Sequence, residues 1–149
     1  MTRLLTLVVL GLALAATLAE AESERLQVTA TVVRQTFTGD LDKPKIGDQS
    51  INRVVLFDEQ DTEVGTGTGI CTLVSLPPQD TLVQCLITAV FDKKGQIIFG
   101  GIAPLPEIGA VGHFGILGGT NDFRTARGEA TLVVISPELQ DGTFDLEID

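Results

Sequence analysis

Residues 68–92 read TGICTLVSLPPQDTLVQCLITAVFD. The two prolines and the polar residues at 76–81 are typical of a turn. The flanking segments, 68–76 and 81–92, are rich in the β-branched and apolar residues that favour strands. This stretch therefore predicts an antiparallel hairpin.

Cys71 and Cys85 lie symmetrically about Pro78 in this hairpin, so its two arms would bring them side by side. Cross-strand partners stand about 4.5–5.5 Å apart at their Cα atoms, a separation that a disulfide can bridge. In an oxidising compartment we expect a Cys71–Cys85 disulfide. Two buried free thiols are the alternative, because cysteine is among the most buried residue types.

The remaining sequence also predicts strands. Apolar and polar residues alternate at 26–32 and again at 143–149, which is typical of strands with one buried face. Four further strands are expected at 54–58, 96–102, 112–118 and 124–134, with turns at 93–95, 104–109 and 140–142.

Eight strands in one chain of this length suit an antiparallel up-and-down barrel or a sandwich. We predict a single all-β domain over residues 22–149, with the fold of an eight-stranded antiparallel up-and-down β-barrel. A barrel of this size encloses either packed side chains or one small ligand.

Residues 1–21 have the pattern of a secretory signal peptide. Arg3 precedes an apolar run without charges at 4–18, and Ala19-Glu20-Ala21 fits the small-x-small cleavage pattern. A membrane anchor is the alternative, but the run is shorter than the ~20 residues that span a bilayer. We therefore predict a secreted, extracellular protein with no membrane span in its mature form.

Composition and motifs restrict the function. The 149 residues include 20 acidic and 10 basic side chains, so the net charge of −10 argues against nucleic-acid binding. The single histidine leaves little material for a metal centre, and the acidic turn at 58–63 does not match a calcium loop. No serine lies in a Gly-x-Ser-x-Gly elbow, which argues against a hydrolase. We predict no metal and no cofactor.

The segment at 82–91 is apolar on both of its strand faces. One face can fill a barrel, whereas the other would normally be polar in a monomer. This pattern predicts a homo-oligomer, a dimer or a trimer, that packs through the barrel wall.

Residues 118–130, GGTNDFRTARGEA, resemble the Gly-Gly-Thr-Gly-x-Phe-x-x-Ala-Arg-Gly-x-Ala signature of dirigent proteins. Residues 54–58 are similar to a strand ending in Asp in that family. Residues 64–73 are similar to the Ile-Gly…Gly-Leu-Cys-Val-Leu stretch of allene oxide cyclases. The resemblance covers approximately residues 26–134.

Both families form eight-stranded antiparallel barrels whose cavity receives a hydrophobic small molecule. Dirigent proteins steer the coupling of phenoxy radicals or assist quinone-methide cyclisation, and allene oxide cyclases fold a fatty-acid epoxide so that it closes stereospecifically. The resemblance therefore implies a ligand such as an oxylipin, a phenolic or a polyketide-like compound.

The signature itself is interpreted as structural. Gly118, Gly119 and Thr120 are expected to form a tight turn, and Phe123 to plug one end of the barrel. Arg127 is expected to pair with an acidic neighbour, while Gly128 lets a strand pass closely.

Asp58 and His113 are the candidate catalytic residues. The acid that matches Asp58 in dirigent proteins faces the pocket, where it could donate or accept a proton; alternatively, Asp58 only opens the polar turn that follows it. His113 lies close to the position of a dirigent Arg, which falls on Gly112 here, and it can also be an ordinary hydrogen-bonded residue. Phe57, Phe99 and Phe114 are the predicted ligand-binding residues.

Two functions remain open. The first is a secreted barrel that binds a hydrophobic small molecule and guides its stereoselective cyclisation or coupling, as an isomerase, a cyclase or a dirigent-like auxiliary without a redox centre of its own. The second is a non-catalytic extracellular barrel that carries a ligand or has a structural role. A dry cavity of about 300 Å³ or more, with Asp58 or His113 at its wall, would favour the first, and a filled interior the second.

Overall fold

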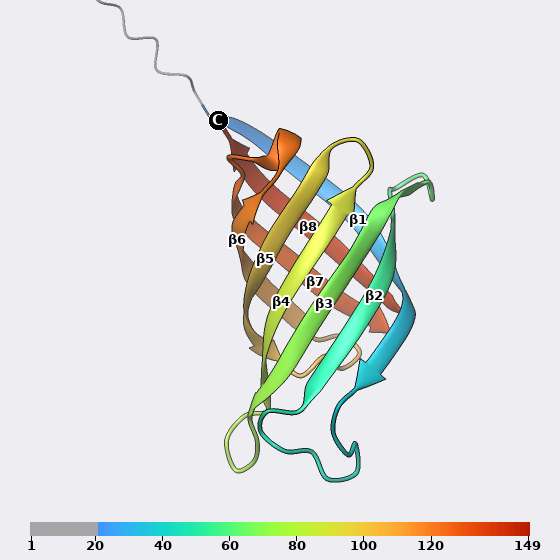
Figure 1. Ribbon diagram of the computed structural model, residues 1–149, viewed down its shortest axis with the longest axis vertical. Coiled ribbons are helices and arrows are strands. Elements are labelled where there is room, and N and C mark those ends of the chain that lie inside the picture. The colour runs from blue at the N-terminus through green and yellow to red at the C-terminus, as the bar shows by residue number, and fades with distance from the viewer. Residues whose placement is uncertain (1–20) are drawn as a thin grey trace, which may run out of the picture.

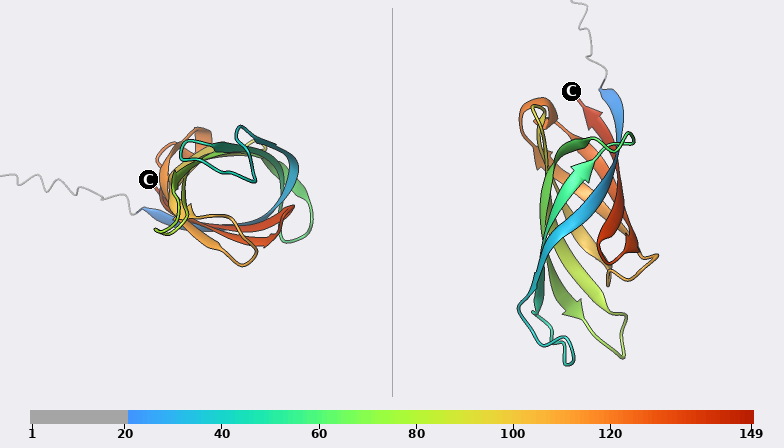
Figure 2. Two further views of the ribbon diagram at one scale, coloured as in Figure 1. Left: turned by 90° about the horizontal axis from the view of Figure 1, so that it is seen from below. Right: turned by 90° about the vertical axis from the view of Figure 1, so that its right-hand side faces the viewer.

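The computed structural model describes residues 21–149, which form a closed, antiparallel, eight-stranded β-barrel (Figure 1). Each strand pairs with its neighbour in the chain, and the first pairs with the last, so that the sheet closes into a ring (Figure 2). The predicted fold class is therefore confirmed. The predicted signal peptide lies outside the described residues, except for Ala21. The elements are β1 (Glu22–Phe37), β2 (Gln49–Phe57), β3 (Glu63–Ser75), β4 (Leu82–Phe91), β5 (Gly95–Pro104), β6 (Val111–Gly119), the 3-10 helix η1 (Asn121–Phe123), β7 (Arg127–Ser136) and β8 (Leu139–Ile148).

The seam between β1 and β8 closes the barrel. Leu26 on β1 faces Phe144 on β8 in the strand register, and both follow the apolar phase of their strands. On the outer surface, Arg25 forms a salt bridge with its register partner Asp145. The hydrogen bond from this guanidinium to the Asp145 carboxylate raises the pKa of Arg25.

Aromatic side chains fill one end of the barrel. Phe123, on η1, is 1% exposed, and its ring centroid lies 5.5 Å from that of Phe91. Phe144 packs against Phe91 at 5.9 Å and against Phe99 at 5.2 Å. These rings close the end at which β2, β4 and β8 terminate, the upper end in Figure 1. We call it the plugged end, and the opposite end, with the β1–β2, β3–β4, β5–β6 and β7–β8 connections, the loop end.

The final hairpin differs from the sequence-based prediction. The turn expected at 140–142 is wrong, because these residues lie within β8 and the chain turns instead at Pro137 and Glu138. Proline cannot donate a hydrogen bond to the strand ladder, so Pro137 ends β7. Gly142 faces the interior, where a Cβ would lie 3.2 Å from a Leu132 methyl carbon and 3.3 Å from one of Val28.

Candidate functional site

The barrel encloses a cavity of about 110 Å³ with a mainly apolar lining. Phe99 and Phe144 line it toward the plugged end, whereas the Phe114 ring lies over Gly112, nearer the loop end. Pro104 and Pro106 line it at the loop end and are exposed to solvent. The cavity therefore runs from the aromatic rings to an opening at the loop end.

The cavity is smaller than the ~300 Å³ of a pocket that buries a drug-sized ligand, so it does not reach the size expected of a catalytic barrel, but neither is the interior filled. It is much larger than the roughly 10–15 Å³ that one water needs on this measure. Phenylalanines fill the plugged end, whereas glycines and alanines in the lining leave space beyond it. A ring-sized apolar group therefore fits inside, and a larger ligand would extend into the opening.

Glycines at inward positions create this space. Gly67 lies on β3 opposite Val54, and a Cβ there would stand 2.8 Å from a Val54 methyl carbon. Gly112 lies on β6, where a Cβ would stand 2.7 Å from the Phe114 ring. Both glycines line the cavity. Neighbouring side chains can lean over these positions only because no Cβ is present.

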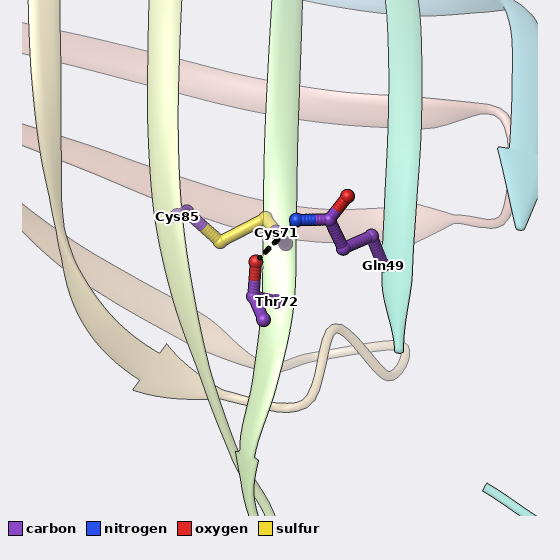
Figure 3. Close-up of a disulfide and its surroundings, with 4 residues drawn as sticks. All are labelled: Gln49, Cys71, Thr72 and Cys85. Carbon is purple, nitrogen blue, oxygen red and sulfur yellow. Dashed lines mark hydrogen bonds between the residues drawn. A yellow bond between two sulfur atoms is a disulfide. The ribbon is translucent and has the colours of Figure 1, made fainter. Parts of the chain in front are cut away.

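The predicted disulfide is present and forms part of the cavity wall. Cys71 on β3 and Cys85 on β4 are register partners with Cα atoms 4.0 Å apart, and their sulfur atoms are bonded (Figure 3). Both residues line the cavity. Beside the disulfide, the Gln49 side chain on β2 donates a hydrogen bond to the Thr72 hydroxyl at 3.1 Å (Figure 3).

Two carboxamides supply the polar side chains at inward positions of the wall. Asn52 is on the same strand phase as the inward residues Val54 and Leu56, and Gln140 pairs in register with the buried Ala30. Over the described residues, no charged side chain lines this cavity. The site can therefore exclude water and offer amide hydrogen bonds, but it presents no acid or base.

Asp58 does not line the cavity. It lies in the turn after β2, at the plugged end, and its Oδ1 accepts hydrogen bonds from the backbone N–H groups of Gln60 and Thr62, both at 2.9 Å. This is the turn-opening role that the sequence left as the alternative. Phe57, the preceding residue, is half-buried and does not line the cavity either.

His113 lies on the outer surface of β6. Its side chain is 62% exposed, and its Nδ1 lies 3.0 Å from Glu129 Oε1 on β7. Strand alternation turns the next residue, Phe114, inward. Of the predicted site residues, the structure thus places Phe99, Phe114 and the two cysteines at the cavity and Phe57, Asp58 and His113 away from it.

The prediction from sequence missed Asn52 and Gln140. Asn52 carries a signal that could have found it, because a polar residue stands on the apolar phase of the strand Asn52-Arg53-Val54-Val55-Leu56. Gln140 was hidden by the turn wrongly predicted at 140–142.

The glycine-rich signature forms the plugged end, remote from the opening. Gly118 and Gly119 end β6, and the Thr120 hydroxyl accepts a hydrogen bond from the Gln96 backbone N–H at 3.1 Å. Phe123 follows within the 3-10 turn and is buried.

The last part of the signature fixes the C-terminus. Arg127 donates to the Asp149 carboxylate at 2.8 Å and lies 3.5 Å from Glu147. Gly128 lies in the left-handed region, with φ 128°, against the backbone of Asp145. These contacts join β7 to the end of β8.

Among residues 21–149, no group of three or more His, Cys, Asp or Glu side chains is placed to hold a metal ion. The same part of the chain contains no helix that is long and apolar enough to cross a membrane.

Comparisons with known proteins identify the fold. No protein family and no curated protein match the sequence. Among solved structures, the chain is similar to a pyocyanin demethylase (22% identity, TM-score 0.72, covering 83% of this chain and 99% of the other). It is also similar to AbnU, an exo-specific intermolecular Diels-Alderase (16% identity, TM-score 0.74, covering 85% of this chain and 98% of the other). A third similar structure is that of the pterocarpan synthase dirigent protein GePTS1 (18% identity, TM-score 0.67, covering 99% of this chain and 98% of the other). The chain therefore shares its barrel with a dirigent protein and a Diels-Alderase.

Proposed function

We propose that this protein binds a neutral, lipophilic small molecule, with an apolar part inside the barrel, and guides its cyclisation by holding it in one conformation. The observation that carries the proposal is the apolar cavity, plugged by phenylalanines at one end and open at the other. The likeness of the fold to a Diels-Alderase and a dirigent protein supports the same class of function.

The wall supports catalysis by confinement. A flexible substrate that is held in a reactive geometry loses much of the entropic part of its barrier, and exclusion of water prevents side reactions. Because no charged side chain and no histidine lines the cavity in the described chain, the proposal uses no protein acid or base. Cyclisations in which the bonds rearrange within the substrate suit such a wall. Phe99 and Phe114 supply flat surfaces against which the substrate can pack.

A non-catalytic ligand carrier is the second candidate. The specific observation in its favour is that Asp58 and His113 lie away from the cavity, so that neither predicted catalytic group reaches a bound ligand. A carrier returns its ligand unchanged, whereas the proposed cyclisation changes the ligand without changing its mass when the reaction is intramolecular.

Secretion belongs to the proposal as well. The signal-peptide pattern at 1–21 and the Cys71–Cys85 disulfide support an oxidising, extracellular location.

Native mass spectrometry of protein collected from the culture medium tests these points together. We expect a chain that begins at Glu22 and has lost two hydrogen atoms on formation of the disulfide, with a co-purifying lipophilic compound. Chromatography of an acyclic isomer of that compound before and after incubation with the protein separates the two candidates, because a cyclase converts the isomer and a carrier returns it unchanged. Failure to retain any compound, and to bind lipophilic probes, would overturn the proposal.

A cavity-filling variant provides the matched control. Ala103 is buried and lines the cavity, whereas its neighbour Ile102 points outward and is 61% exposed. We expect Ala103→Phe to weaken binding of a lipophilic probe at least tenfold, because the new ring occupies the ligand volume. Ile102→Phe should leave the affinity unchanged. Circular dichroism of both variants checks that the overpacked interior still folds. Equal affinities in two folded variants would place binding outside the barrel.

A further inference from the structure

The oxygen of the Asn52 side chain is a buried acceptor without a partner. Oδ1 is screened from solvent and receives no hydrogen bond from the described residues. A buried polar group without a partner destabilises the fold, so such groups are rare in native proteins and call for an explanation.

The position of Asn52 supplies that explanation. It lies near the start of β2, close to the loop end, and lines the cavity beside apolar side chains. Its register neighbours are Gly69 on β3, which has no side chain, and Gln35 on β1, which is exposed. The carboxamide lines the cavity, so a turn about its Cβ–Cγ bond would bring this unused acceptor to the space in which a ligand would sit.

We propose that Asn52 is the specificity-determining residue of the cavity and accepts a hydrogen bond from a hydroxyl or N–H group of the ligand. This inference rests on the proposed function and narrows its ligand class to neutral, lipophilic molecules with such a donor. The apolar part of the ligand lies toward Phe99 and Phe144, and the donor lies nearer the loop end. Carboxylate ligands are disfavoured, because no cation lines the cavity among the described residues and the net charge is −10.

Isosteric probes test the inference. 2-Naphthol and 2-methylnaphthalene have nearly the same shape, but only the first can donate a hydrogen bond. Their dissociation constants are measured by fluorescence titration on the wild type, on Asn52→Leu and on the control Gln60→Leu, in which an exposed amide at the plugged end is removed. We expect Asn52→Leu to shift the ratio of the two constants about fivefold against naphthol. Gln60→Leu should keep the wild-type ratio.

Each result has a defined meaning. An unchanged ratio in folded Asn52→Leu overturns the inference, while binding of both probes leaves the proposed function standing. Binding of neither probe to the wild type overturns both the inference and the proposed function.

A third probe, 2-methoxynaphthalene, can only accept a hydrogen bond. If it, rather than naphthol, loses affinity selectively in Asn52→Leu, the amide acts as a donor and the inferred ligand class is wrong. A rise in the melting temperature of ligand-free Asn52→Leu supports the inference, because the unpaired oxygen is removed.

Discussion

Gly128, near the start of β7, occupies a position at which the fold leaves no room for a side chain. Its φ is 128°, and an added Cβ would meet the carbonyl oxygen of Asp145 on β8. We expect Gly128→Ala to lower the free energy of unfolding by about 2–3 kcal/mol, because both backbone strain and a backbone clash oppose the new methyl group. Urea denaturation followed by circular dichroism measures the change.

Gly115 is the matched control for this substitution. It lies exposed on β6, its backbone is not left-handed, and an added Cβ would have nothing within 4 Å. Gly115→Ala should change the free energy of unfolding by less than about 0.5 kcal/mol. Equal effects of the two substitutions would contradict the structural role of the glycine in the signature.

Residue types predicted the apolar part of the site better than its polar part. Phe99 and Phe114 reach the cavity because burial follows directly from hydrophobicity. The side of the sheet to which a polar residue points depends instead on strand phase and on turns. His113 is out of phase with Phe114, and Asp58 is used by its own turn. The resemblance to dirigent proteins did not resolve either point.

At the scale of elements, the disulfide joins β3 and β4, two neighbouring strands of one hairpin. Its cysteines are 14 residues apart, and closing a loop of about this length stabilises a fold by roughly 3 kcal/mol in the chain-entropy model. We expect reduction to lower the melting temperature by about 10 °C. Thermal melts with and without reductant measure this, and thiol titration confirms that the bond is broken.

The double variant Cys71→Ala/Cys85→Ala separates the disulfide from other effects of the reductant. Its melting temperature should already be low and should not respond to reductant. If the melting temperature of the wild type is the same with reductant, although thiol titration finds both cysteines reduced, then the pairing of the hairpin strands alone sets the stability.

The two hairpins of greatest interest differ in how well the sequence specifies them. In the β3–β4 hairpin, the proline pair, the symmetric cysteines and the apolar arms all indicate the same register. In the β7–β8 hairpin, Gly142 imitates a turn residue although its function is to leave interior space. Sequence alone does not distinguish a glycine needed for a turn from one needed for close packing.

At the scale of the whole molecule, strand number and alternation predicted the closed barrel, but not its internal volume. The cavity depends on how far the aromatic rings extend and where glycines replace side chains, which are properties of three-dimensional packing. The size of the cavity restricts the ligand more than the fold does, because similar barrels occur in proteins as different as a demethylase and a dirigent protein.

The outer wall supports the expected homo-oligomer. Ile51, Ile70 and Leu86 are successive register partners across β2, β3 and β4, and they are 36%, 40% and 54% exposed in the single chain. A row of apolar side chains across three strands is the kind of surface that subunit packing covers.

We expect the wild type to form a dimer or trimer, and Leu86→Glu to shift it toward monomer, because an interface would have to bury the new charge. Size-exclusion chromatography with light scattering measures the mass. Gln27→Glu, an equal change of charge on exposed β1, should leave the assembly intact, and a monomeric wild type at high concentration would contradict packing through this wall.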